Sequence, residues 1–156
     1  MVQLKRLAKF GCPRSLLLTI YKTFIQAKID YGISIWGCTT NENLNKIQRL
    51  QNRAARIICN EWDFKETRGD DLVRNLRLQT IQERRDYFLT KLTFESIHGL
   101  LPNYLCDRIT MRFDLHGYQT HGSTNMDIFL PGRRSNILDR SLLYAGGRLW
   151  NALHSG

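Results

Sequence analysis

The chain has 156 residues, of which 42% are hydrophobic and 24% charged, a composition typical of one folded domain, or one and a half, and not of a disordered chain. The N-terminus has no apolar core of signal-peptide length, and lysines and an aspartate interrupt the apolar run 16–36, which argues against a membrane span. Four widely spaced cysteines without a C-x-x-C pair predict reduced thiols in an intracellular protein of the nucleus or cytoplasm.

The excess positive charge is concentrated in the first third of the chain. Residues 1–56 contain ten basic and two acidic residues, a net of +8, whereas the remaining residues contain thirteen basic and twelve acidic ones, a net of +1. Evenly spread charge would indicate only solubility. Charge gathered in one region predicts a polyanionic partner for that region.

The first predicted helix runs from Ser15 to Trp36, after Pro13, which suits a first helical turn. Gly32 weakens its end and Gly37 is expected to terminate it. Five apolar residues fall on one face of this helix: Leu17, Ile20, Phe24, Ala27 and Tyr31. An apolar face without a partner would lead to self-association.

A basic helix is predicted from Asn45 to Ile58, extending to about Cys59, with N-cap candidates at 39–41. Its apolar face is expected to contain Ile47, Leu50, Ala54, Ile57 and Ile58. A cationic stripe recurs one position earlier and contains Lys46, Arg49, Arg53 and Arg56. A helix of this kind is suited to lie along a phosphate backbone, and the alternative is an ordinary solvated face.

Other polar side chains in this half have two interpretations each. Lys22 and Lys28 on the preceding helix either extend the cationic track or are ordinary exposed lysines. The amides of Gln48, Gln51 and Asn52 either contact sugars and groove edges or satisfy neighbouring helices.

The sequence of the second half of the chain predicts further helices. A loop at 60–69 precedes a short helix at 70–75 with acids in its first turn. Thr80 and Glu83 form a capping-box pattern, which predicts a long helix to about His98, ended by Gly99. The expected apolar face of that helix contains Ile81, Tyr87, Phe88, Leu92 and Phe94.

Toward the C-terminus, Pro102 opens a short helix, and residues 114–132 predict an irregular loop or loose hairpin. Helical character returns at 138–153, where Gly146 and Gly147 are expected to interrupt it. Trp36 and Trp150 are interpreted as core anchors. The arginine pairs 84–85 and 133–134 could contact phosphate, but nearby acids or a loop position make them weak evidence for nucleic-acid binding. The predicted fold class is all-α, a helical, thumb-like bundle.

Four segments of the sequence resemble the C-terminal region of reverse transcriptases from non-LTR retrotransposons, of the jockey-like and CR1-like kind. The likeness spans about residues 14–153 and keeps the order of the family's motifs. The matching residues are Tyr31, Gly32, Trp36 and Gly37; Lys46, Gln48, Gln51, Asn52, Ala54, Arg56 and Ile58; Pro102, Tyr104 and Leu105; and Leu149, Trp150, Asn151 and Leu153. The family's terminal Leu-Pro is Leu153-His154 here.

The resemblance implies a thumb-like basic region at 1–60, followed at 61–156 by the C-terminal extension of a reverse transcriptase. Reverse transcriptases need palm aspartates that hold two metal ions. The chain offers one adjacent acidic pair, Asp70-Asp71, interpreted as solvated acids at a helix N-terminus. We therefore expect a fragment without the catalytic palm: no catalytic residues, no cofactor and no enzymatic activity by itself.

The predicted partner is an RNA–DNA or RNA template–primer, bound weakly by this region alone, and no membrane is expected. No metal site is expected, because the late residues Cys106, His116, His121 and His154 lack zinc-knuckle spacing. Two alternatives stay open: a helical module that binds protein, and an incomplete gene whose product continues upstream into the palm.

Overall fold

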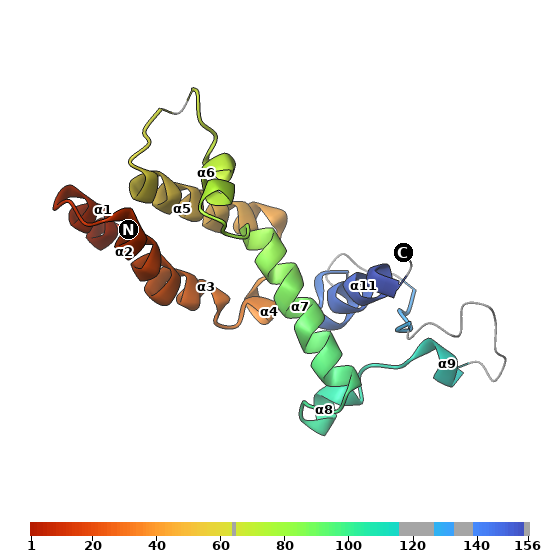
Figure 1. Cartoon of the computed structure of the whole chain (residues 1–156). Helices are drawn as coiled ribbons and strands as arrows, with labels where there is room; N and C mark the ends of the chain where they lie inside the picture. Colours follow the sequence, from red (N-terminus) through yellow and green to blue (C-terminus); the bar gives the residue numbers. More distant parts are fainter. Residues whose placement is uncertain (64, 116–126, 133–138, 155–156) are drawn as a thin grey trace. The chain divides into compact units, whose positions relative to one another are not determined.

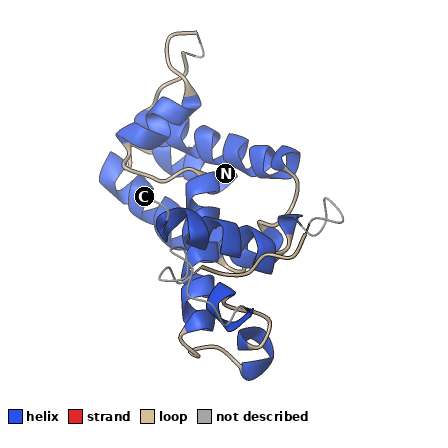
Figure 2. Cartoon of the chain, turned by 90° about the vertical axis from the view of Figure 1, so that its right-hand side faces the viewer, coloured by secondary structure: helices blue, strands red, loops and turns tan. Residues whose placement is uncertain are grey.

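The computed structural model describes residues 1–63, 65–115, 127–132 and 139–154. Every regular element within these ranges is helical, as Figure 2 shows, so the predicted all-α class is confirmed. An isolated antiparallel bridge joins Met111 and Ile128. Most of the predicted loop or hairpin at 114–132 lies outside the described residues. The description of the bundle as thumb-like stays a prediction.

The helices follow one another as α1 (Val2–Lys9), α2 (Arg14–Ile20), η1 (Tyr21–Gln26), α3 (Ala27–Asp30), α4 (Ile33–Trp36), α5 (Asn41–Cys59), α6 (Gly69–Asn75), α7 (Ile81–Ile97), α8 (Asn103–Cys106), α9 (Arg112–Leu115) and α11 (Leu142–His154). Figure 1 labels them along the chain. All four cysteines are free, as predicted. No helix in the described ranges combines the length and apolar character needed to cross a bilayer.

The chain forms two compact units. Unit 1 contains residues 1–33 and 39–84, and unit 2 contains residues 34–38 and 85–156. The chain therefore passes from one unit to the other within α4, between α4 and α5, and within α7. The division predicted at residue 60 was drawn from charge and family resemblance, and it stays a prediction.

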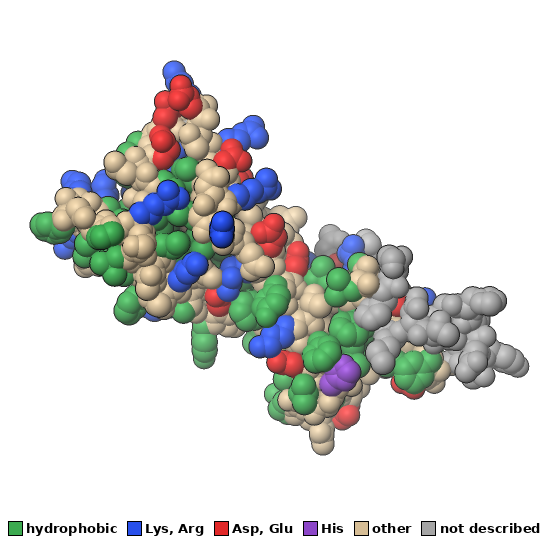
Figure 3. Space-filling view, viewed as in Figure 1, with side chains coloured by type: hydrophobic (Ala, Val, Ile, Leu, Met, Phe, Trp, Pro, Cys, Tyr) green, Lys and Arg blue, Asp and Glu red, His purple; other side chains and the backbone are tan. Residues whose placement is uncertain are grey.

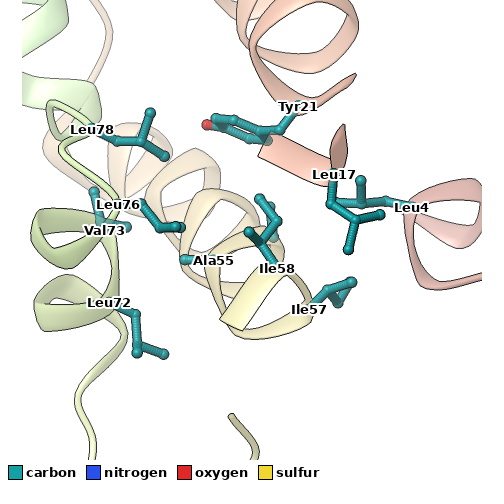
Figure 4. Packing of buried hydrophobic residues seen from close by; sticks show 11 residues of the cluster. Leu4, Leu17, Tyr21, Ala55, Ile57, Ile58, Leu72, Val73, Leu76 and Leu78 are labelled. Carbon is teal, nitrogen blue, oxygen red and sulfur yellow. The ribbon is translucent and has the colours of Figure 1, made fainter. Parts of the chain in front are cut away.

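The core of unit 1 is built around α5, against which α1, α2 and α6 pack. Its buried side chains are Leu4, Leu17, Tyr21, Ala54, Ala55, Ile57, Ile58, Leu72, Val73, Leu76 and Leu78 (Figure 4). Each large apolar side chain buried in this way contributes roughly 1.5–3 kcal/mol. Burial also raises the pKa of the Tyr21 hydroxyl, so that residue stays neutral.

The first long helix departs from the prediction in two respects. Residues 21–26 form a π-helical turn, whose wider hydrogen-bonded rings shift the buried face by about one residue. Tyr21, four residues after the buried Leu17, is fully buried, whereas Phe24 and Tyr31, which lie within and beyond the π-helical turn and were predicted for the apolar face, are 70% and 87% exposed. The helix also ends early, because Gly32 adopts a φ of 68° that other residues rarely adopt. The expected continuous helix to Trp36 is wrong.

The start and end of α7 agree with the prediction. The Thr80 hydroxyl accepts a hydrogen bond from the Glu83 N–H at 3.2 Å, and the Glu83 carboxylate accepts one from the Thr80 N–H at 2.8 Å. Gly99, with a φ of 66°, follows the last turn. The predicted apolar face is wrong in part: Tyr87 and Phe94 are 56% and 45% exposed.

In unit 2 the buried face of α7 contains Leu89, Thr93 and Ser96. The two hydroxyls can be buried because each donates a hydrogen bond to a backbone carbonyl: Thr93 to Leu89 at 2.9 Å and Ser96 to Leu105 at 3.2 Å. Sequence periodicity alone did not distinguish these small polar residues from exposed ones.

The last helix, α11, runs through Gly146 and Gly147 without the predicted interruption. A Cβ atom at Gly146 would lie 2.3 Å from the Thr93 hydroxyl oxygen, and one at Gly147 would lie 2.8 Å from Leu130. The glycines therefore permit close packing within unit 2 and do not break the helix. Trp150 is buried, as expected of a core anchor.

Candidate nucleic-acid interface

The orientation of α5 is set by three side-chain amides that hold it to the segments around it. Gln48 accepts a hydrogen bond from the Ile81 N–H at 2.9 Å, and Gln51 donates to the Gln79 carbonyl at 2.9 Å. Asn52 donates to the Asp70 carboxylate at 2.8 Å. Gln48 also donates to the side chains of Gln51 and Asn52. These amides form hydrogen bonds with neighbouring parts of the chain, which confirms the interpretation that they satisfy neighbouring helices.

Three of the four predicted cations lie on the exposed side of α5. Lys46, Arg49 and Arg53 are exposed, spaced by three and four residues along the helix. Lys46 pairs with Glu42 at 3.4 Å, a solvent-screened surface pair that holds the ammonium only weakly. Figure 3 shows Lys and Arg side chains over the visible face of unit 1, with acidic side chains gathered where the 60–69 loop protrudes.

Arg56, the fourth predicted member of the stripe, is buried and only 7% exposed. Its guanidinium donates to the backbone carbonyls of Asp63 at 3.1 Å and Thr67 at 2.7 Å. The predicted exposure of Arg56 is therefore wrong, because the chain folds back over the end of α5. Leu50, predicted for the apolar face, is likewise 49% exposed.

The loop that Arg56 holds begins at Asn60, whose left-handed conformation (φ 53°) ends α5. Within the loop, the Asp63 carboxylate accepts hydrogen bonds from the N–H groups of Lys65 at 2.7 Å and Glu66 at 3.2 Å. Those two bonds lower the pKa of the Asp63 carboxyl below its usual 3.8. The loop is therefore fixed by its own carboxylates as well as by Arg56.

A concavity of about 410 Å³ opens between α5 and this loop. It is lined by Arg49, Asn52, Arg53, Arg56, Trp62 and Gly69. Trp62 is 44% exposed, and the Lys5 ammonium lies 5.7 Å from the centre of its ring. Trp62 was not among the site residues predicted from the sequence. Its position in a charged loop directly after a basic helix was the feature from which it could have been predicted.

The other basic residues considered in the sequence lie outside α5. Lys22 on η1 and Lys28 on α3 are exposed, and their role stays a prediction. Arg84 forms a bidentate pair with Asp30, with nitrogen–oxygen distances of 2.6 and 2.5 Å, and so stabilises unit 1. Arg85 pairs with Asp86 within unit 2. Residues 133–134 lie outside the described part of the chain.

The adjacent acids Asp70 and Asp71 occupy the first turn of α6, as the sequence indicated. Both are exposed, and Asp70 accepts the Asn52 hydrogen bond described above. Among the described residues, no group of three or more His, Cys, Asp and Glu side chains is arranged to hold a metal ion. His116 and His121 lie outside the described ranges.

Comparison with known proteins finds two relatives in Drosophila melanogaster. The chain is 38% identical over 65 residues to the "Probable RNA-directed DNA polymerase from transposon X-element", and 46% identical over 54 residues to the "Probable RNA-directed DNA polymerase from transposon BS". These matches cover 41% and 35% of this chain, but only 7% and 6% of the relatives' lengths.

No family model matches the chain, and no solved structure matches it significantly. The two relatives bear out the resemblance to reverse transcriptases that the motifs indicated. The chain thus contains a region related to the RNA-directed DNA polymerases of transposons.

Proposed function

We propose that the exposed face of α5 binds the phosphate backbone of a nucleic-acid duplex, such as an RNA–DNA or RNA template–primer. The observation that carries the proposal is the row of exposed cations Lys46, Arg49 and Arg53 on a helix that the amides of Gln48, Gln51 and Asn52 hold in place. Because the helix backbone is already ordered, binding has to order only the cationic side chains. Arg56, predicted as a contact, acts here as a positioning residue for the loop.

The relatives support this choice of partner, because an RNA-directed DNA polymerase acts on nucleic acid. We further propose that this chain supplies binding and no nucleotide transfer by itself. Its adjacent carboxylates, Asp70 and Asp71, are placed at the N-terminus of α6, where they interact favourably with the helix dipole. A primer-extension assay with the purified chain should show no incorporation, and any incorporation above background would contradict this part of the proposal.

The proposal is tested by binding to an RNA–DNA hybrid across a series of salt concentrations. Three phosphate contacts predict that log K falls against log salt with a slope of about −2.7. The triple variant Lys46→Glu, Arg49→Glu, Arg53→Glu should lose binding and most of the slope. A matched control, Lys9→Glu, Lys91→Glu, Arg112→Glu, changes the net charge equally at exposed positions outside the proposed face.

The control separates a specific face from a general charge effect. The proposal holds if the control variant keeps at least half of the wild-type affinity while the α5 variant loses at least tenfold. Equal losses in both variants would show that overall charge, and not α5, governs binding. Absence of binding by the wild-type chain would overturn the proposal outright.

A second candidate function is self-association, favoured by apolar side chains exposed on unit 1. Phe10 and Phe24 are 85% and 70% exposed, which leaves both aromatic rings in contact with water. Sedimentation velocity should then show a concentration-dependent dimer that Phe24→Ser weakens. A monomer at all concentrations would reject this candidate without affecting the first.

A further inference from the structure

We infer that the concavity beside Trp62 binds one unpaired nucleotide, with the base stacked on the Trp62 indole and the adjoining phosphates on Arg49 and Arg53. This inference rests on the proposed function and makes it more specific, because it names a single-stranded extension of the duplex as the preferred ligand. The α5 cations alone would not distinguish a blunt duplex from an extended one.

The dimensions and lining of the concavity suit such a ligand. Its volume, about 410 Å³, falls within the range of roughly 300–1,000 Å³ of small-ligand sites. One side offers the two exposed guanidinium groups of Arg49 and Arg53, and the other offers the indole of Trp62. Aromatic rings beside a positively charged groove are the recurring means of binding single strands without sequence preference.

The wall that carries Trp62 is held in place before any ligand binds. Arg56 fixes the loop through the carbonyls of Asp63 and Thr67, one and five residues after Trp62. The Glu61 carboxylate accepts a hydrogen bond from the Asp63 N–H at 3.0 Å, which fixes the backbone on both sides of Trp62. A stacking platform whose flanking backbone is already hydrogen-bonded loses little backbone entropy on binding.

Close packing also shapes the part of the concavity that Asn52 and Gly69 line. A Cβ atom at Gly69 would lie 2.7 Å from the Cβ of Asn52, so only glycine permits this approach. The Asn52 amide is held by Asp70 and by Gln48, at 2.8 Å in both cases. The fixed amide keeps α5 and the start of α6 together along the lining of the concavity.

The experiment compares three labelled ligands by fluorescence anisotropy: a blunt RNA–DNA hybrid, the same hybrid with a short single-stranded extension, and the extended hybrid with abasic sites in the extension. The wild-type chain should bind the extended hybrid more tightly than the blunt one. Abasic sites should remove that preference, because they keep the phosphates but remove the bases. Trp62→Ala should reduce affinity for the extended hybrid by about 5-fold to 150-fold, the range that base stacking covers.

Trp62→Ala should change affinity for the blunt hybrid by less than about twofold, whereas Trp62→Phe should retain most of the preference. Tyr104→Ala, which removes another exposed aromatic, serves as the matched control and should behave as wild type. Circular dichroism spectra of all variants establish that each is folded.

Two outcomes separate this inference from the proposed function. If blunt and extended hybrids bind alike, with the salt slope of α5 intact and no effect of Trp62→Ala, the inference is overturned and the proposed function stands. If the wild-type chain binds neither hybrid, both are overturned.

Discussion

Unit 1 and unit 2 hold their longest helices by different kinds of contact. In unit 1, α5 is anchored by amide hydrogen bonds to distant backbone groups and by a buried arginine. In unit 2, α7 is packed through small residues, with Thr93 against Gly146. Unit 1 carries 15 basic and 8 acidic residues, a net of +7, whereas unit 2 carries 8 and 6, a net of +2.

The difference explains where a binding surface can form. The amide anchors and buried apolar residues of α5 leave its exposed residues free to carry charge, because the helix does not need those residues for packing. In unit 2, the fully described part of α7 carries Arg85, paired with Asp86, and Lys91, paired with Glu95, and not a row of three exposed cations like that of α5. We therefore expect substitutions in unit 2 to affect stability alone, and substitutions in unit 1 to separate stability from binding.

The largest effect is expected for Leu89→Ala in unit 2. Leu89 is fully buried, and unit 2 has few other fully buried apolar side chains among its described residues. Truncation of a buried leucine costs about 2–5 kcal/mol in the free energy of unfolding, which urea denaturation measures. Leu100→Ala is the matched control in the same unit, because Leu100 is 67% exposed, and it should change stability by less than about 0.5 kcal/mol.

If the two leucine variants were equally stable, α7 would not be packed into a core at Leu89, and the contrast between the units would fail. Nucleic-acid binding by both variants should match the wild type wherever they are folded.

The second prediction separates Arg56 from Arg53 within unit 1. Arg56→Gln removes charge-assisted bonds to two carbonyls and should lower the free energy of unfolding by about 2 kcal/mol. Its salt slope for the RNA–DNA hybrid should stay at the wild-type value. Arg53→Gln should do the reverse: stability within about 0.5 kcal/mol of wild type, and a slope smaller by about 0.9.

A slope that falls equally in both variants would restore Arg56 to the phosphate contacts and refute its role as a positioning residue. Urea denaturation and the salt series must therefore be measured on the same two proteins.

Local patterns in the sequence predicted those features that depend on neighbouring residues. The capping box at Thr80 and Glu83 and the helix stop at Gly99 were predicted, because their partners lie within four residues. The helix α1 was not among the predicted helices, although Leu4, Leu7 and Ala8 recur at helical spacing.

Features set by distant residues were not predictable in this way. The spacing of Arg56 matched the exposed stripe, but the loop that returns over α5 buries it. Gly146 resembled a helix breaker because its partner, Thr93, lies far away in the sequence. The π-helical turn at 21–26 shifted a face whose composition gave no sign of the extra residue.

The third prediction tests the close packing of α11 in unit 2. Gly146→Ala gains about 1 kcal/mol of helix propensity but overlaps the Thr93 hydroxyl, an overpacking that costs about 1–3 kcal/mol. We expect a net loss of about 1 kcal/mol in the free energy of unfolding. Adding Thr93→Ala should relieve the overlap and restore part of the loss, giving a measurable coupling between the two sites. A single variant more stable than wild type would show that Gly146 is not required for packing.

The smallest effect concerns the loop of unit 1 and its pH dependence. The lowered pKa of Asp63 means that its ionised carboxylate, bonded to the N–H groups of Lys65 and Glu66, stabilises the folded loop. That contribution is fully present above the usual value of 3.8 and is lost as the pH falls through the lower pKa of the folded state. Amide exchange at Lys65 and Glu66, compared between wild type and Asp63→Asn, should show faster exchange in the variant at pH 6. Because the carboxylate is solvent-exposed, global stability at that pH should hardly differ. Equal exchange rates in the two proteins would indicate that Arg56 and Glu61, without the Asp63 carboxylate, order the wall that carries Trp62.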